Sequence, residues 1–223
     1  MPRAAGHHLL WPNVHLHIFD AEEPGPTALI QAGIHGDEIA GVHAVEELLE
    51  EGLRPRRGRL LVVPVMNPPA YRAQQRAVEG GLDLNRQFPG DPDHERYERK
   101  LAHLFMELVK DEEVALMATL HESKKRYDPE VTPSFGQTLV YGVDPCPPLL
   151  AQVVDELNGH RASDEEAWAT QYYPVSTSST EVIVDAIGCI GVCVETWMGF
   201  ELGRRVQMQR DVVRFLLEGF GTL

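Results

Sequence analysis

The sequence contains little cysteine, few basic residues and no long apolar segment. Three cysteines among 223 residues are too few for a disulfide framework, and reduced, buried thiols fit the cytoplasm. Twenty Lys and Arg against 34 Asp and Glu give a net charge of −14, which argues against nucleic acid and anionic membranes as partners because both carry like charge. No stretch approaches the roughly 20 apolar residues that span a bilayer, and we see no secretion signal. We therefore expect a cytoplasmic protein.

The rest of the composition is typical of a globular chain. Hydrophobic residues make up 43% and charged residues 24%, which excludes disordered and fibrous classes. A chain of this length buries roughly 70% of its unfolded surface, enough for a core without disulfide or metal support. We see no internal repeat or linker, and we predict one domain over residues 1–223.

Apolar runs of strand length alternate with helical patterns along the chain. The predicted strands cover residues 14–19, 28–33, 60–65, 114–120, 138–141 and 190–194. The predicted helices cover residues 38–53, 93–110, 147–159 and 201–217, with long polar loops at 67–92 and 161–181. This alternation predicts an α/β domain whose mainly parallel sheet is covered on both faces.

Ligand sites of such sheets lie beyond the carboxyl ends of the strands, and chemically related side chains occur there. His35 and Glu38 follow the second predicted strand, and His121 follows the fourth. Two imidazoles and one carboxylate are the ligand set of a catalytic zinc that keeps one position open for water. Glu195 follows the last predicted strand and is a spare carboxylate that can take the proton of that water.

Each of these residues has a simpler explanation when it is taken alone. Glu38 suits the first turn of a helix, where acidic side chains are favoured. His121 is then a hydrogen-bonded histidine at a strand end, and Glu195 a solvated carboxylate. The hypothesis of a metal site therefore depends on the combination.

The first polar loop supplies candidate groups for binding an anion. Arg86 has a planar guanidinium that can grip a carboxylate through two hydrogen bonds, and Asn85 beside it offers amide donors. Arg76 is a second cation earlier in the same loop. In an acidic protein these groups suggest an anionic substrate. The alternative is that the arginines pair with surface acids such as Glu79 and Asp83.

Together, these motifs resemble the zinc carboxypeptidase superfamily, which includes the succinylglutamate desuccinylase and aspartoacylase branch. The matching elements, in the order of that superfamily, are Gly33-Ile-His-Gly-Asp-Glu38, Asn67-Pro68, Arg76, Asp83-Leu-Asn-Arg86, Phe88-Pro-Gly90, His121 and Glu195. They run from about residue 28 to residue 200. The resemblance implies a three-layer α/β/α sandwich with a mixed, mainly parallel sheet of about eight strands, and a single catalytic domain.

The resemblance also implies roles for individual residues. One zinc ion per chain would be held by His35, Glu38 and His121, with Glu195 as the general base. Arg76 would polarise the scissile carbonyl, while Asn85 and Arg86 would bind the terminal carboxylate of the substrate.

A tyrosine and two departures complete the comparison with the superfamily. Tyr173, or its neighbour Tyr172, matches the mobile tyrosine that carboxypeptidases carry upstream of the base, although a Tyr-Tyr pair is also ordinary packing. Only 28 residues follow Glu195, fewer than the C-terminal β domain of the desuccinylase and aspartoacylase branch needs. Glu122 stands where a small residue is usual, and either orients an imidazole or pairs with Lys124 or Arg126.

The leading hypothesis is zinc-dependent hydrolysis of an amide bond next to a free carboxylate, by a metallocarboxypeptidase acting on a peptide or small peptide-like substrate. The alternatives are an N-acyl-amino-acid deacylase of the succinylglutamate desuccinylase/aspartoacylase type and a non-catalytic protein that binds a carboxylate or a metal. The expected partner is a small peptide or acylated amino acid with a free carboxylate. Glu181, near the tyrosines, is a candidate for preferring a basic substrate group.

Overall fold

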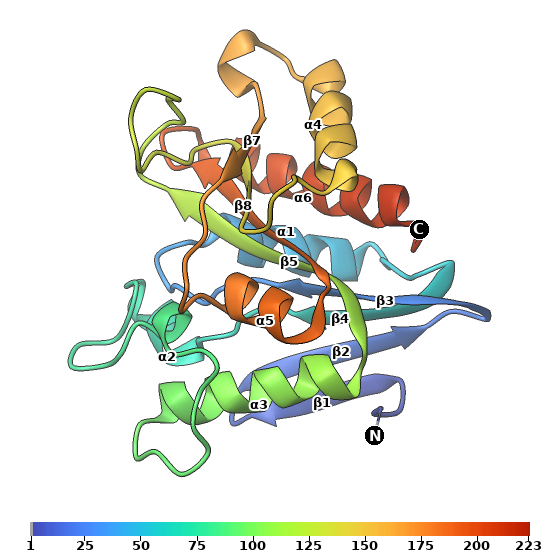
Figure 1. Ribbon diagram of the computed structural model, residues 1–223, viewed down its shortest axis with the longest axis vertical. Coiled ribbons are helices and arrows are strands. Elements are labelled where there is room, and N and C mark those ends of the chain that lie inside the picture. The colour runs from blue at the N-terminus through green and yellow to red at the C-terminus, as the bar shows by residue number, and fades with distance from the viewer. Residues whose placement is uncertain (1) are drawn as a thin grey trace.

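One mixed sheet runs through the computed structural model, which describes residues 2–223 (Figure 1). Within this range eight strands lie in the order β1-β2-β4-β3-β5-β8-β6-β7. Their bounds are Gly6–Trp11 (β1), Val14–Asp20 (β2), Glu23–Gln31 (β3), Arg57–Val63 (β4), Val114–Ser123 (β5), Thr138–Tyr141 (β6), Ala169–Tyr172 (β7) and Ile190–Trp197 (β8). The central neighbours β4, β3, β5 and β8 are parallel, and antiparallel pairs flank them. The predicted mixed α/β sheet is confirmed.

Helices cover both faces of this sheet. The helices are Ala40–Glu50 (α1), Pro68–Ala73 (α2), Tyr97–Asp111 (α3), Pro148–His160 (α4), Ser179–Ile187 (α5) and Leu202–Phe220 (α6), with 3-10 turns at Leu84–Arg86 and Asp164–Glu166. One hydrophobic cluster joins α1, α4 and α6 to the sheet, and a second joins α3 and α5 to its other face. None of the described helices combines the length and apolar character needed to cross a bilayer.

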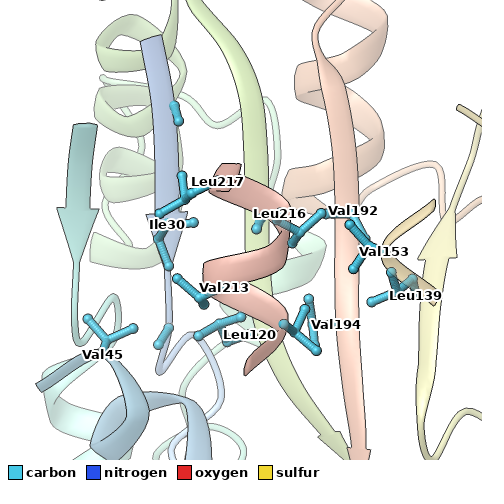
Figure 2. Close-up of a cluster of buried hydrophobic side chains, with 14 of the residues drawn as sticks. Ile30, Val45, Leu120, Leu139, Val153, Val192, Val194, Val213, Leu216 and Leu217 are labelled. Atoms are coloured by element: carbon cyan, nitrogen blue, oxygen red, sulfur yellow. The ribbon is translucent and has the colours of Figure 1, made fainter. Parts of the chain in front are cut away.

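The two-residue period of the strands divides the core between these faces. In β3, Ile30 contributes to the cluster beneath α6, whereas Leu29 contributes to the cluster beneath α3. Figure 2 shows Val213 and Leu216 of α6 close to Ile30 and to Val192 of β8. The central strands are therefore buried on both faces, which explains their continuous apolar runs.

Three segments differ from the prediction. Residues 6–11, for which the sequence predicted no strand, form β1, because the hairpin with β2 carries Leu10 into the second cluster. The first polar loop contains α2, which begins with Asn67 as its N-cap and a proline in its first turn. The second polar loop contains β7 and the start of α5, whose N-cap is Ser178. Short elements that depend on tertiary partners have little periodicity of their own.

The strands β5 and β8 extend three residues beyond their predicted ends. The extension places His121 and Glu195 inside the strands, where they are direct neighbours in the parallel register. Alternate side chains of a strand share a face, so the extended pairing presents both groups to the same end of the sheet.

Candidate active site

His35, Glu38 and His121 meet at the carboxyl ends of β3 and β5. The Glu38 carboxylate joins the two imidazoles, with Oε1 lying 2.8 Å from His35 Nδ1 and Oε2 lying 2.7 Å from His121 Nδ1. All three residues are buried, and one ligand atom from each lies within 4.8 Å of the others. The structure thus brings together the three residues expected to bind metal, and their donor types suit zinc.

A close approach of two backbone segments shapes the turn that carries His35 and Glu38. A Cβ at Gly36 would lie 2.0 Å from the carbonyl carbon and oxygen of Ala70 in α2. The Gly36 N–H also donates to the Gln75 carbonyl at 3.0 Å. Only glycine allows this contact, so the glycine beside His35 in the sequence motif has a steric cause.

The carboxylates around the imidazoles control their ionisation. Burial alone would lower the pKa of His35, but the carboxylates of Glu38 and Asp83 outweigh burial and raise that pKa to about 9. Burial lowers the pKa of His121 despite its contact with Glu38. Burial opposes ionisation of Glu38, yet the two imidazoles hold its pKa well below the usual range. The cluster is therefore an ionised carboxylate between one protonated and one neutral histidine, an arrangement that a cation can replace.

Glu195 faces the same site from β8. Burial and the neighbouring Glu38 carboxylate raise the pKa of Glu195 to about 8. The Cys193 thiol lies 3.6 Å from Glu195 Oε1, as a donor. A carboxyl group that exchanges its proton near neutral pH has the property that a general base needs.

Arg76 lies at the edge of the cluster. Its Nη1 is 3.3 Å from His35 Nδ1 and 3.6 Å from Glu38 Oε1. Its Nε and Nη2 each lie 2.9 Å from Asp83 Oδ2. Arg76 therefore does pair with Asp83, as the alternative held, and this pairing aims the remaining nitrogen at the cluster.

Asn85 and Arg86 lie in the 3-10 turn that follows Asp83. Asn85 is buried, and its Oδ1 accepts hydrogen bonds from the backbone N–H and the hydroxyl of Ser179, at 2.9 and 3.1 Å. This orientation leaves the amide nitrogen as a donor for a ligand. Arg86 donates to the Asn85 carbonyl at 2.9 Å, and both residues line one cavity with the histidines.

That cavity has a volume of about 410 Å³, and its wall includes the three expected metal ligands, Glu195 and the three candidate binding residues of the first polar loop. Tyr173 lies in the wall, with its ring packed edge-on against Phe135 at a centroid distance of 4.9 Å. Tyr172 instead is 52% exposed and contacts Tyr141. The volume suits a small amino-acid derivative or a short peptide.

Sequence reasoning missed the position of two carboxylates. Asp83 Oδ1 lies 3.3 Å from His35 Nε2, so Asp83 orients the imidazole; its signal was its place two residues before Asn85. Glu122 accepts the Ala40 N–H at 2.9 Å and pairs with Arg205 of α6. Among the described residues, Glu122 therefore pairs with neither Lys124 nor Arg126 and makes no hydrogen bond to an imidazole; it ties the start of α1 to α6.

Comparisons with known proteins show which proteins the chain resembles. Residues 24–129 match the succinylglutamate desuccinylase/aspartoacylase catalytic domain. This segment comprises 106 of the 223 residues, so just under half of the chain is similar to that catalytic domain. The matched segment includes His35, Glu38 and His121, whereas Tyr173 and Glu195 lie beyond it. The tertiary structure alone brings those last two residues to the cavity.

Curated relatives of the chain align with it over part of their length. The chain is 41% identical over 108 residues to an N-alpha-acetyl-L-2,4-diaminobutyric acid deacetylase of Halomonas elongata, which covers 47% of the chain and 30% of that protein. It is 40% identical over 74 residues to a succinylglutamate desuccinylase of Burkholderia pseudomallei, which covers 32% of the chain and 20% of that protein. The alignments therefore span less than a third of these relatives.

Solved structures extend the likeness over almost all of the chain. The cell shape determinant protein Csd4 of Helicobacter pylori superposes with a TM-score of 0.84 at 20% identity, over 95% of this chain and 56% of Csd4. A succinylglutamate desuccinylase of Silicibacter superposes with a TM-score of 0.71 at 25% identity, over 94% and 61% of the two chains. These superpositions confirm the carboxypeptidase-like fold.

Proposed function

We propose that the chain is a single zinc-dependent catalytic domain that hydrolyses an amide bond whose amine half is an amino acid with a free carboxylate. The observation that carries the proposal is the convergence of His35, Glu38 and His121 beside Glu195, in one cavity. The wall of that cavity also holds a carboxylate-binding pair, Asn85 and Arg86.

The donors of the cluster fit zinc. His35 and His121 both turn Nδ1 toward Glu38, while Nε2 of His35 is held by Asp83, so the metal-facing nitrogens are preset. Bound zinc would polarise the amide carbonyl and bring the pKa of a coordinated water to about 7.

Asn85 and Arg86 bind the substrate carboxylate and so fix the distance of the amide from the cluster. Glu195 takes the proton of the attacking water on its carboxylate and then delivers it to the leaving amine. Arg76 donates through the nitrogen that points at the cluster and stabilises the negative charge on the carbonyl oxygen. Loss of one such donor typically lowers turnover by roughly 10²–10³.

Two classes of acyl half are compatible with this site. A peptide is favoured by the superposition with Csd4, which is described as a D,L-carboxypeptidase. A short acyl group is favoured by the family match and by the 41% identical deacetylase, whose named amino acid carries a second amino group. Both classes release an amino acid with a free carboxylate, so the two differ only on the far side of the scissile bond.

The proposal is tested with purified protein loaded with zinc. The substrates are blocked dipeptides and N-acetyl and N-succinyl amino acids. Glu195→Gln should retain zinc and lose at least about 100-fold in turnover, whereas His35→Ala should lose zinc, measured by elemental analysis. Glu79→Gln, a change at an exposed loop acid, is the matched control. Turnover retained by Glu195→Gln would exclude this base, and stoichiometric zinc without hydrolysis would favour a binding protein.

A further inference from the structure

Glu181 places a carboxylate in the cavity wall, and the described part of the chain gives it no cationic partner. The residue is only 9% exposed, and it lines the cavity beside Gly142 and Val175. Among residues 2–223 its carboxylate has one hydrogen bond, from the Val175 N–H to Oε2 at 3.4 Å, and its charged neighbour is another acid, Asp185. A buried carboxylate without a counterion is costly, so this position needs an explanation.

Helix capping does not explain the carboxylate. The sequence Ser178-Ser-Thr-Glu181 has the pattern of a capping box, in which the glutamate returns to the backbone N–H of the N-cap residue. Ser178 does accept from the Glu181 N–H at 3.2 Å, but the Ser178 N–H donates to the Val175 carbonyl at 2.9 Å. The Glu181 side chain is therefore released from its usual capping role.

Gly142 provides the space that the carboxylate occupies. A Cβ at Gly142 would lie 1.8 Å from Glu181 Oε2 and 2.0 Å from Oε1. The backbone of Gly142 does not adopt a positive φ, so its conformation does not demand glycine. The missing side chain instead lets the Glu181 carboxylate reach the cavity wall.

The position of α5 shows which part of a substrate Glu181 would meet. Ser179, in the first turn of this helix, donates to the side chain of Asn85. Glu181 lies two residues further along the same turn. It therefore stands on the side of the cavity where Asn85 and Arg86 would hold the substrate carboxylate, which belongs to the amine half.

We propose that Glu181 forms a subsite for a cationic group on the side chain of the released amino acid, so that preferred substrates carry an ammonium or guanidinium in their amine half. This inference rests on the proposed function. A substrate cation would supply the missing counterion through a charge-assisted hydrogen bond in a desolvated wall. Burial raises the pKa of Glu181, which agrees with a carboxyl group that lacks a positive partner.

The test compares two amine halves of the same shape and different charge. L-ornithine and L-norleucine are each offered as the N-acetyl derivative and at the end of a blocked dipeptide. The wild type should prefer ornithine by at least tenfold in kcat/KM, and Glu181→Gln should reduce this ratio at least tenfold. The glutamine keeps an oxygen for the Val175 N–H, so folding is preserved. Glu79→Gln, an exposed change in the first polar loop, should leave the ratio unaltered.

A binding measurement separates the subsite from the reaction. Calorimetry with zinc-loaded protein measures the affinity for free ornithine and free norleucine, in the wild type and in Glu181→Gln. Hydrolysis without a preference for charge would overturn the subsite and leave the hydrolase. A Glu181-dependent preference for ornithine in binding, without hydrolysis of any substrate, would support the subsite and reject the hydrolase. Neither hydrolysis nor selective binding would overturn both.

Discussion

Zinc binding to the metal-free protein should release protons, and the pKa values of the site predict how many. The carboxylates of Glu38 and Asp83 outweigh burial and raise the pKa of His35 to about 9, so at pH 7 about 99% of this imidazole is protonated. Burial keeps His121 neutral by lowering its pKa. Because a coordinating nitrogen must be deprotonated, His35 should release about one proton.

Glu195 adds a second, separable contribution. Burial and Glu38 raise the pKa of Glu195 to about 8, so about 90% of the carboxyl is protonated at pH 7. A nearby dication favours the ionised form. His35 and Glu195 should therefore release between one and about two protons together in the wild type, and His35 should release about one in Glu195→Gln. Ionisation of a coordinated water would add up to about half a proton at pH 7 in both proteins. Below pH 8 zinc affinity should rise about tenfold per pH unit for each proton released, and the part due to His35 should level off above pH 9, because His35 is then already neutral.

The assay is isothermal titration calorimetry at pH 7 in two buffers that differ in ionisation enthalpy. The dependence of the observed enthalpy on the buffer gives the number of protons released. Asp83→Asn removes one of the two carboxylates beside His35 and so lowers the pKa of this imidazole. At pH 8 the variant should therefore release fewer protons on zinc binding than the wild type. If neither the wild type nor Glu195→Gln released protons at pH 7, the role of His35 as a ligand would be refuted.

Three further outcomes follow from the packing around the site. Glu122→Ala leaves the guanidinium of Arg205 buried without its partner, so the free energy of unfolding in urea should fall by about 3–5 kcal/mol; the double variant with Arg205→Met should lose less, and equal losses would contradict this. Gly36→Ala forces a Cβ against the Ala70 carbonyl, so we expect a loss of about 1–3 kcal/mol with weaker zinc binding, and unchanged thermal melts and zinc titrations would oppose it. Burial raises the pKa of the Cys193 thiol well above its usual value, so iodoacetamide should modify it much more slowly in native than in denatured protein; equal rates by mass spectrometry would count against that burial.

The central strands were predictable because each has an unambiguous local signal. Residues 28–33 and 114–120 are continuous apolar runs, and such runs occur in strands that are buried on both faces. His35 and Glu38 could be paired from the sequence since three residues of one turn separate them. His121 could be placed near them because the carboxyl ends of parallel strands lie at one edge of a sheet.

The small elements at the margins were missed because tertiary partners stabilise them. The strand β1 needs the hairpin with β2, and β7 needs the edge of β6. Helix α5 has nine residues, fewer than the roughly 12–15 that an isolated helix needs in water. Its position decides where Glu181 and Ser179 meet the cavity, so the specificity side of the site was hidden from local patterns.

The order of residues along the chain was enough to establish the donor chemistry: two imidazoles, a carboxylate between them in sequence and a cationic loop. It was also enough to establish an α/β sheet, because hydrophobic periodicity is a local property. Only the folded chain settled which carboxylate does what. Glu38 contacts both histidines, Glu122 pairs with Arg205, Glu195 stands beside His121, and Glu181 has no cation beside it among residues 2–223. The reason is physical, since four glutamates with the same intrinsic chemistry acquire different ionisation and partners only through the distances and burial that packing imposes on them.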